Sequence, residues 1–204
     1  MMNPREIFGD IDIYLFDQIL KERFPVNSKI LDAGCGYGRN IFYFLQQRYD
    51  VYGIDQNRDA VEHLRKTAQE LASDLPPENF AVGKLEEMPF EKDLFDAVIS
   101  SAVLHFAADE KNFLEIFGEM WRVLKKGGLF FARLASTIGI EDRVKQINGR
   151  RFLIPDGSER FLVDQEFLLS ITEKSDGTLL DPIKTTNVQN LRSMTTWVVR
   201  KNPD

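Results

Sequence analysis

The sequence contains little cysteine, little histidine and no long apolar segment. A single cysteine, Cys35, excludes a disulfide within the chain, which fits a reducing compartment. Two histidines, His63 and His105, and no Cys/His cluster at metal-ligand spacing give no support to a bound metal. No apolar run approaches the roughly 20 residues that cross a membrane. The first residues also lack the pattern of a secretory signal, so a cytoplasmic protein without a membrane partner is expected.

Basic charge is scarce as well. The 204 residues include 26 Lys and Arg against 32 Asp and Glu, for a formal net charge of −6. A protein that grips a nucleic-acid backbone usually carries a basic surface. The composition therefore disfavours nucleic acid as a partner, and it leaves the oligomeric state open.

Glycine is concentrated in residues 29–40, KILDAGCGYGRN. A short apolar run ends in an aspartate, and glycines then stand at three alternate positions, Gly34, Gly36 and Gly38. Apolar residues recur at helical spacing after Asn40. The pattern predicts a strand, a glycine loop and a helix, because such a turn needs unusual backbone angles and no Cβ in the way of a ligand.

Strand and helix patterns alternate up to residue 135. Strands are expected at residues 50–55, 79–83, 94–100 and 129–132, and helices at 10–24, 57–71 and 109–125. The helix at 10–24 is expected to bury Ile13, Phe16, Leu20 and Phe24, which recur at helical spacing. This regular alternation predicts a parallel sheet with right-handed crossovers.

The pattern changes after Ala135. Residues 136–163 are expected to form an irregular excursion, with a helix at 140–147 and a small hairpin near the turn signals Asn148-Gly149 and Asp156-Gly157. A helix at 164–174 and strands at 183–188 and 195–199 follow. No internal repeat or linker is visible, so a single domain is expected over residues 1–204.

The glycine segment allows two functional interpretations. A dinucleotide fingerprint, G-x-G-x-x-G, would place its third glycine at position 39, where the chain has Arg39. The spacing found, an acid followed by G-x-G-x-G, resembles motif I of the class I S-adenosylmethionine (SAM)-dependent methyltransferases. Asp55, at the end of the second expected strand, could accept hydrogen bonds from both hydroxyls of a ribose in either class. An NAD(P)-dependent oxidoreductase is therefore the less favoured alternative.

Three further segments resemble the same family, so that the resemblance covers about residues 28–135. Residues 83–90 resemble the loop that borders the adenine, 96–106 resemble strand four and its exit, and 121–129 resemble the helix and Gly-Gly turn before strand five. The resemblance implies a Rossmann-like three-layer α/β sandwich, whose seven-stranded, mostly parallel sheet has an antiparallel edge strand. It also implies SAM as cofactor and S-adenosylhomocysteine (SAH) as product.

The resemblance also implies where the cofactor lies. Asp32 and the glycines would hold its methionine end, Asp55 the ribose, and residues 84–86 the adenine. In the family, an acid often bonds the adenine amino group at the position of Lys84, and a lysine cannot accept that hydrogen bond. The full predicted set is Asp32, Gly34, Cys35, Gly36, Gly38, Asn40, Asp55, Gln56, Lys84, Leu85, Glu86, Ser101 and Ala102.

The methyl acceptor is less defined by the sequence. His105 follows the fourth expected strand and would face the methyl-transfer site, where it could act as a general base near neutral pH. Arginines of residues 133–160 could clamp a carboxylate or phosphate, although a solvated, salt-bridged surface is the more ordinary explanation. The candidate acceptor contacts are Tyr14, His105, Arg133, Arg151 and Trp197.

The predicted function is SN2 methyl transfer from SAM to a small-molecule acceptor, with an anionic acceptor as one option. The expected layout is an N-terminal helical cap at 1–27, a SAM-binding core at 28–135, the excursion near the acceptor at 136–163, and a helix with the last two strands at 164–204. A non-catalytic SAM-binding regulatory module is the alternative, because methyl transfer needs few diagnostic side chains.

Overall fold

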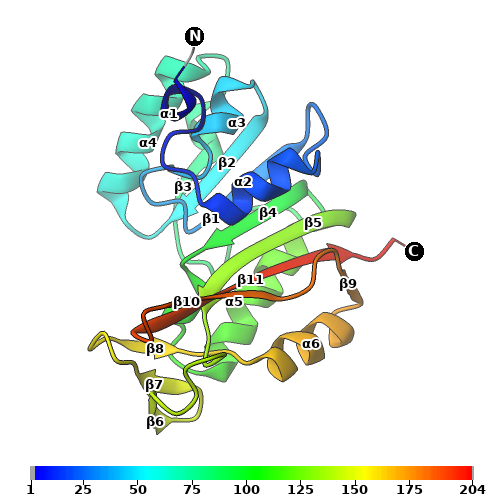
Figure 1. The fold of residues 1–204 in the computed structure, drawn as a ribbon. Coiled ribbons are helices and arrows are strands. Elements are labelled where there is room, and N and C mark those ends of the chain that lie inside the picture. Colours follow the sequence, from blue (N-terminus) through cyan, green and yellow to red (C-terminus); the bar gives the residue numbers. More distant parts are fainter. Residues whose placement is uncertain (1–2, 204) are drawn as a thin grey trace.

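A strand in the interior of the sheet organises the chain (Figure 1). In β1, Lys29–Ala33, Leu31 points to one face of the sheet and Ile30 to the other, and both are fully buried. Such a strand belongs in the middle of a covered sheet. The computed structural model describes residues 3–203, so residues 1, 2 and 204 of the expected domain lie outside the described part.

The main sheet has the strand order β10-β11-β5-β4-β1-β2-β3, with the short β9 paired to β11. Strands β1 to β5 run parallel, and β11 runs antiparallel to β5. The expected mostly parallel sheet with an antiparallel edge is confirmed, and β9 is an additional strand. The remaining bounds are β2 Asp50–Asp55, β3 Phe80–Val82, β4 Phe95–Ser101, β5 Leu124–Ala135, β9 Gly177–Leu179, β10 Lys184–Val188 and β11 Arg192–Lys201.

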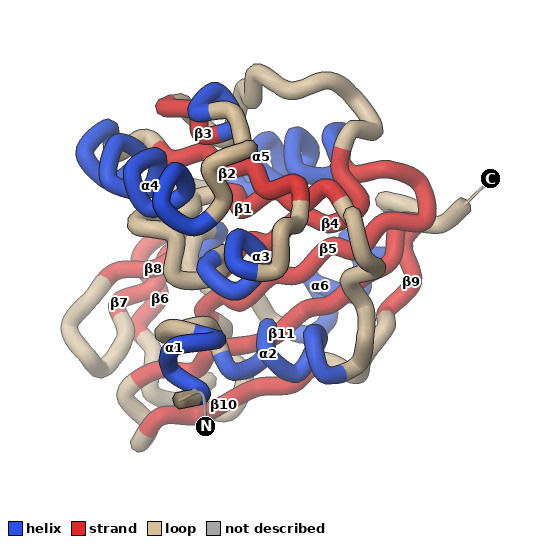
Figure 2. The backbone as a smooth tube through the Cα atoms, turned by 90° about the horizontal axis from the view of Figure 1, so that it is seen from above, coloured by secondary structure: helices blue, strands red, loops and turns tan. Residues whose placement is uncertain are grey.

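Helices cover both faces of this sheet, which gives three layers (Figure 2). One face is covered by α2 Ile13–Leu20, α3 Phe42–Gln46 and α4 Arg58–Leu71, and the other by α5 Glu110–Val123 and α6 Gln165–Lys174. The short α1, Pro4–Phe8, lies against α3, where the rings of Phe8 and Tyr43 stack 5.2 Å apart. Single turns of 3-10 helix stand at Pro77–Asn79 and Leu104–Phe106. Within residues 3–203, no helix is both long and apolar enough to cross a membrane.

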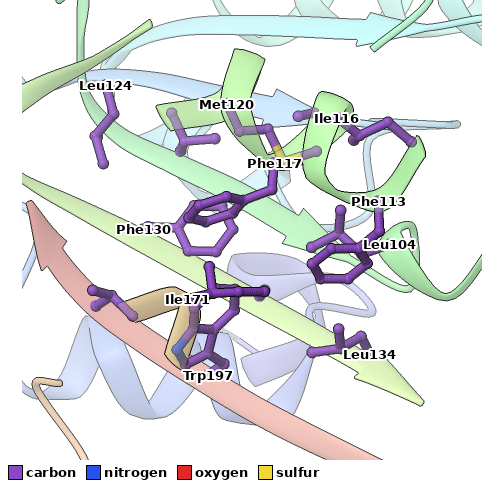
Figure 3. Packing of buried hydrophobic residues seen from close by; sticks show 14 of the residues in the cluster. Leu104, Phe113, Ile116, Phe117, Met120, Leu124, Phe130, Leu134, Ile171 and Trp197 are labelled. Carbon is purple, nitrogen blue, oxygen red and sulfur yellow. The ribbon is translucent and has the colours of Figure 1, made fainter. Parts of the chain in front are cut away.

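Aromatic rings pack among aliphatic side chains in the layer between the sheet and helices α5 and α6 (Figure 3). The Phe117 ring of α5 stacks on Trp197 of β11 at 5.3 Å and meets Phe130 of β5 edge-on at 5.4 Å. The indole Nε1 of Trp197 donates to Thr172 Oγ1 of α6 at 2.9 Å. Because Trp197 is sealed in this core, the prediction that it contacts the acceptor is wrong.

The predicted helix at 140–147 is also wrong. Turns lead instead into a second sheet of three antiparallel strands, β6 Lys145–Asn148, β7 Arg151–Leu153 and β8 Glu159–Phe161. Ile140 is fully buried, whereas Ile147, seven residues later, is 51% exposed, so residues at helical spacing share no buried face. The turn signals at Asn148-Gly149 and Asp156-Gly157 do mark the two turns of this small sheet.

The junction before β5 differs from expectation as well. The helix ends at Val123, and β5 begins at Leu124, ahead of the Gly127-Gly128 pair. The pairing of β4 with β5 is irregular here: Phe95 pairs with Leu124 and Ala97 with Leu129, so residues 125–128 of β5 lie opposite a single residue of β4. Gly127, within this part of β5, has φ 78°. The glycines therefore sit inside an irregular strand rather than at the helix end.

Helix α2 buries a different face from the expected one. Leu15 and Gln18 are buried, whereas Ile13 is 70% exposed and Leu20 is 66% exposed. Of the other two residues expected inside, Phe16 is half-buried, and Phe24 is buried but lies beyond the end of the helix. The N-terminus of the helix is fixed by Asp12, whose Oδ1 accepts the Tyr14 N–H at 2.9 Å. Polar contacts thus decide which face of α2 turns inward.

Asp181, between β9 and β10, holds the other end of α2. Its carboxylate accepts hydrogen bonds from Gln18, Lys21 and Arg23. The bond from Arg23 Nη1 to Asp181 Oδ2 is 2.9 Å long. Although burial acts in the opposite direction, the bonds from Arg23 and Lys21 lower the pKa of Asp181 to about 2. This carboxylate stays ionised and anchors the helix at neutral pH.

The corrected face of α2 makes a stability prediction. Leu15→Ala should lower the free energy of unfolding by about 2–5 kcal/mol, because it leaves a cavity in the core. Ile13→Ala, on the same helix, should change it by less than about 0.5 kcal/mol. Urea unfolding followed by circular dichroism measures both, and the opposite ranking would restore the face expected from the sequence.

Candidate cofactor and acceptor site

A cavity of about 330 Å³, here the first cavity, lies at the carboxyl ends of β1, β2, β3 and β4. This end of an open α/β sheet is where ligands bind. Seven predicted cofactor residues line it, and six further residues were not predicted. The lining consists of Gly34, Asp55, Gln56, Gly83, Lys84, Leu85, Glu86, Ala102, Val103, Phe106, Ala107, Asn112 and Ile116.

The glycine loop needs its glycines for two different reasons. Gly34 and Gly38 have φ of 83° and 82°. A Cβ would lie 2.4 Å from a Val103 side-chain carbon if it were added at Gly34, and 2.4 Å from a Leu64 side-chain carbon if it were added at Gly38. Gly36 has φ 49°, but nothing lies within 4 Å of its Cβ position. Close packing therefore requires Gly34 and Gly38, whereas the Gly36 backbone borders open space.

Asp55 ends β2 next to this loop. Its Oδ2 accepts the Gly36 N–H at 2.9 Å, and its Oδ1 accepts the Asn57 N–H at 2.8 Å. Each carboxylate oxygen retains a further lone pair. Two backbone groups thus fix the carboxylate at the wall of the first cavity with capacity to accept two more donors.

Asp32 is buried beneath the loop, and neither of its carboxylate oxygens has a hydrogen-bond partner among residues 3–203. Burial raises the pKa of Asp32 to about 7, against the opposing effect of Arg39. A buried carboxylate without a partner is costly. A cationic group bound above the loop would relieve this cost, and SAM carries an ammonium and a sulfonium, so the residues fit this cofactor.

Several predicted cofactor residues lie behind the cavity wall rather than on it. Cys35 is packed in the core, and burial raises the pKa of its thiol, which makes it a poor nucleophile. Asn40 Oδ1 accepts the Asp12 N–H at 3.1 Å, and Gly38 packs against α4. These residues support the loop from behind.

The segment after β3 forms the opposite wall. Glu86 Oε1 accepts a hydrogen bond of 2.8 Å from Asn112 Nδ2 of α5, which orients both groups. Leu85 packs against the core, and with Ala107 and Ile116 it gives the cavity an apolar part of its lining. The Lys84 side chain is exposed at the cavity edge. Nothing in the local sequence of α5 marked Asn112, because only the tertiary fold brings it to Glu86.

A second cavity of about 310 Å³ meets the first at Ala102, the residue that lines both. Ala102 has φ 63°, and its N–H donates to Arg133 O at 2.7 Å, so a tight turn after β4 separates the cavities. The second cavity draws on the segment before α2, on β5, on the β7–β8 region and on β11. Its lining is Asp12, Arg39, Ser101, Ala102, His105, Arg133, Ala135, Ile154, Asp156, Arg160, Arg192 and Met194.

The predicted acceptor residues are distributed unevenly around this cavity. Arg133 lies in the wall of this cavity, and its Nη1 donates to Asp12 Oδ2 at 3.1 Å. Its guanidinium lies over the Tyr14 ring, 4.7 Å from the ring centre. Tyr14 stands behind Arg133, and its hydroxyl is hydrogen-bonded to Thr186. Arg151 lines neither cavity, because it is held by Ala107 O and Glu159. The predicted acceptor contact of Arg151 is therefore not supported.

His105 is buried in the wall of the second cavity. Its Nδ1 accepts the Ala135 N–H at 3.3 Å, which leaves the ring proton on Nε2. Burial, reinforced by Arg160 and Arg192, lowers the pKa of His105 to about 4. Such an imidazole is neutral and weakly basic at neutral pH, so the geometry opposes the predicted general-base role and favours a hydrogen-bond donor.

Comparison with known proteins places these features in a family. The sequence matches the methyltransferase domain family over residues 31–132, half of the chain, and the chain belongs to this family. It is 34% identical over 122 residues to the biotin biosynthesis bifunctional protein BioHC of Teredinibacter turnerae, which covers 57% of this chain and 20% of that protein. It is 29% identical to the arsenite methyltransferase of Rattus norvegicus over 58% of this chain and 34% of that protein. The matched segment thus spans a fifth to a third of these two relatives.

Solved structures share the whole fold. A SAM-dependent methyltransferase from Methanosarcina mazei superimposes with a TM-score of 0.75 at 20% identity, covering 91% of this chain and 98% of that one. The 1,6-didemethyltoxoflavin-N1-methyltransferase of Burkholderia thailandensis was solved with bound 1,6-didemethyltoxoflavin and SAH. It superimposes with a TM-score of 0.72 at 16% identity, covering 96% of this chain and 80% of that one. The family, the Rossmann-like fold and SAM as the cofactor, all predicted from the sequence, are confirmed.

The raised pKa of Asp32 predicts a pH-dependent stability. Between the ordinary pKa of 3.8 and about 7, the folded chain binds more protons at Asp32 than the unfolded chain, so stability falls as pH rises. From pH 6.5 to 8, where His105 is already neutral, the thermal midpoint of the ligand-free wild type should fall relative to that of Asp32→Asn. Calorimetric scans at both pH values test this, and parallel curves for the two proteins would contradict it.

The environment of His105 makes a second pH prediction. In an NMR titration, the His105 ring signals should stay in the neutral form down to about pH 4, with the proton on Nε2. The only other histidine, His63, is exposed on α4 and serves as the internal reference. Protonation of His105 near pH 6.5 would instead reinstate it as a general base.

Proposed function

We propose that the chain transfers the methyl group of SAM to a small molecule held in the second cavity. The observation that carries this proposal is the meeting of the two cavities at Ala102, with the glycine loop and Asp55 on one side and polar side chains on the other. When bound, SAM would supply a methyl group activated by its sulfonium: an electron pair of the acceptor would form a bond to the methyl carbon as the carbon–sulfur bond breaks and SAH leaves. The chain then has mainly to align the acceptor with that methyl group.

The roles proposed for the first cavity follow from its contacts. The Asp55 carboxylate, fixed by two backbone N–H groups, would accept both ribose hydroxyls. Leu85 and Ile116 would hold the adenine ring between apolar side chains, beside Glu86 as oriented by Asn112. The Gly34 and Gly36 backbone would carry the methionine end, above the buried Asp32.

The second cavity supports a small acceptor. Its volume of about 310 Å³ is that of a small-molecule site, and the small sheet β6–β8 contributes to its wall. Two relatives are named for small acceptors, arsenite and 1,6-didemethyltoxoflavin. The net charge of −6 argues against a polynucleotide in this position.

We extend the proposal to the layout and the compartment. Residues 1–204 would act as one methyltransferase unit, with the cap at 1–27, the core at 28–135, the excursion at 136–163 and the closing segment at 164–204. Leu15 of the cap shares a buried cluster with Ile30 of the core, and Arg160 of the excursion lines the second cavity. A reducing compartment such as the cytoplasm suits the single, buried thiol.

The role of Asp55 can be tested by calorimetric titration with SAH. Asp55→Ala should weaken SAH binding by about 10-fold or more, since hydrogen bonds to a charged group contribute about 1.5–3 kcal/mol each. Asp59→Ala removes an exposed carboxylate from the first turn of α4 and should bind SAH like the wild type.

NADH is the cofactor control for the same titration. Binding of NADH without SAH would reject the SAM site, and unchanged affinity of Asp55→Ala would reject the ribose role. Tight SAH binding without turnover of any acceptor would favour the regulatory alternative.

A further inference from the structure

Two arginines of the second cavity lack the carboxylate partner that most arginines of this chain have. Arg23 pairs with Asp181, Arg150 with Asp164, and Arg133 with Asp12. Within the described part of the chain, neither Arg160 nor Arg192 forms an ion pair, although acids outnumber bases in the sequence. Among the described residues Arg65 and Arg200 also form no ion pair, but of these four arginines only Arg160 and Arg192 line this cavity.

The two arginines come from different sheets. Arg160 belongs to β8, and its guanidinium lies over the Phe106 ring, 4.8 Å from the ring centre. Its Nη1 donates to the backbone oxygen of Glu159 at 2.7 Å. Stacking fixes the plane of this group and leaves its other N–H donors available. Arg192 begins β11 of the main sheet, and its side chain makes no hydrogen bond with any other described residue.

The charges around the cavity do not cancel. Four arginines, Arg39, Arg133, Arg160 and Arg192, line it with two aspartates. Asp12 is engaged by Arg133 and, at 3.8 Å, by Arg39. Asp156 Oδ1 accepts hydrogen bonds from the backbone and hydroxyl of Ser158. A surplus of positive charge therefore remains in the cavity of an otherwise acidic protein.

No described residue in this cavity is suited to remove a proton from an acceptor at neutral pH. His105 has its Nδ1 occupied by the Ala135 N–H, and Asp12 is held in its ion pairs. Against the effect of burial, bonds from Ser158 and the charges of both Arg160 and Arg192 lower the pKa of Asp156, so this carboxylate stays ionised beside the two arginines. An acceptor with an already ionised group suits such a cavity, because it needs no general base.

We propose that the second cavity binds the acceptor through an oxyanion, a carboxylate or a phosphate, held between Arg160 and Arg192. The planar forks of arginine match the oxygens of both groups, and the Nε2–H of His105 supplies a further donor nearby. Ile154 and Met194 provide an apolar wall for the body of the acceptor. This inference rests on the proposed function, because it assigns the acceptor of that same methyl transfer.

The test uses benzoate and inorganic phosphate as oxyanion probes and benzamide as the neutral analogue of benzoate. Each is titrated into the SAH-bound protein while the ring signals of His105 are followed by NMR. We expect saturable shifts with at least one oxyanion and none with benzamide. The oxyanion whose shifts saturate at the lower concentration shows whether the site prefers a carboxylate or a phosphate.

Variants then assign the binding to the two arginines. Arg160→Gln and Arg192→Gln should each weaken the oxyanion at least about tenfold, which is 1.4 kcal/mol. Arg192→Lys should recover only part of the affinity, because it keeps the charge without the fork. Arg200→Gln is the matched control, because Arg200 is exposed on the same strand, eight residues or about 26 Å from Arg192. This variant should bind the oxyanion like the wild type.

The outcomes separate this inference from the proposed function. Calorimetry with SAH should give wild-type affinity for every arginine variant. If the wild type binds no SAH, the proposed function itself fails. If SAH binds but neither oxyanion saturates, or benzamide shifts His105 equally, or both Arg→Gln variants keep full affinity, only the oxyanion site is overturned.

Discussion

The turn from β1 into the glycine loop is tied to the end of β2, and both cavities depend on this connection. The N–H groups of Gly34 and Cys35 both donate to Ile54 O, at 2.8 and 3.1 Å, and the next N–H, of Gly36, donates to Asp55 Oδ2. These bonds draw the loop across the sheet edge and fix its path. A side chain on Gly34 would collide with Val103, which belongs to the turn after β4. Three strand ends are thereby held at one place.

The segment before α2 completes the site from the other side. The carboxylate of Asp12 caps α2, accepts hydrogen bonds from Ser101 and Arg133, and forms an ion pair with Arg39 of the glycine loop. Its backbone N–H donates to Asn40 Oδ1. One buried carboxylate thus joins the N-terminal segment, the loop and the ends of β4 and β5. The anchor at Asp181 holds the far end of the same helix. The N-terminal region is therefore part of the wall of the second cavity and more than a cover over the sheet.

Charge is distributed differently in the two cavities. In the first, the carboxylates of Asp55 and Glu86 line the wall with Lys84 at its exposed edge, and Asp32 lies buried nearby, so negative charge outweighs positive and suits a ligand with hydroxyls and positive charge. In the second, arginines outnumber aspartates, and a neutral His105 lines the same wall. This contrast between neighbouring cavities suits a cationic methyl donor beside an acceptor of opposite charge, because each ligand meets complementary charge.

Local sequence patterns were enough to predict most units up to β5 and seven of the residues that line the first cavity. Hydrophobic period and glycine spacing depend on neighbours within a few residues, so the strands to β5, the loop at Gly34–Gly38 and the position of Asp55 could be read directly. The tertiary structure decided everything that depends on distant partners. It placed Trp197 in the core against Phe117, turned α2 by polar contacts to Asp181, and replaced the helix at 140–147 by a small sheet. It also brought Asp12, Arg160 and Arg192 to His105. These side chains lie far apart in the chain and belong to no local motif, so only the packing of two sheets could reveal the second cavity.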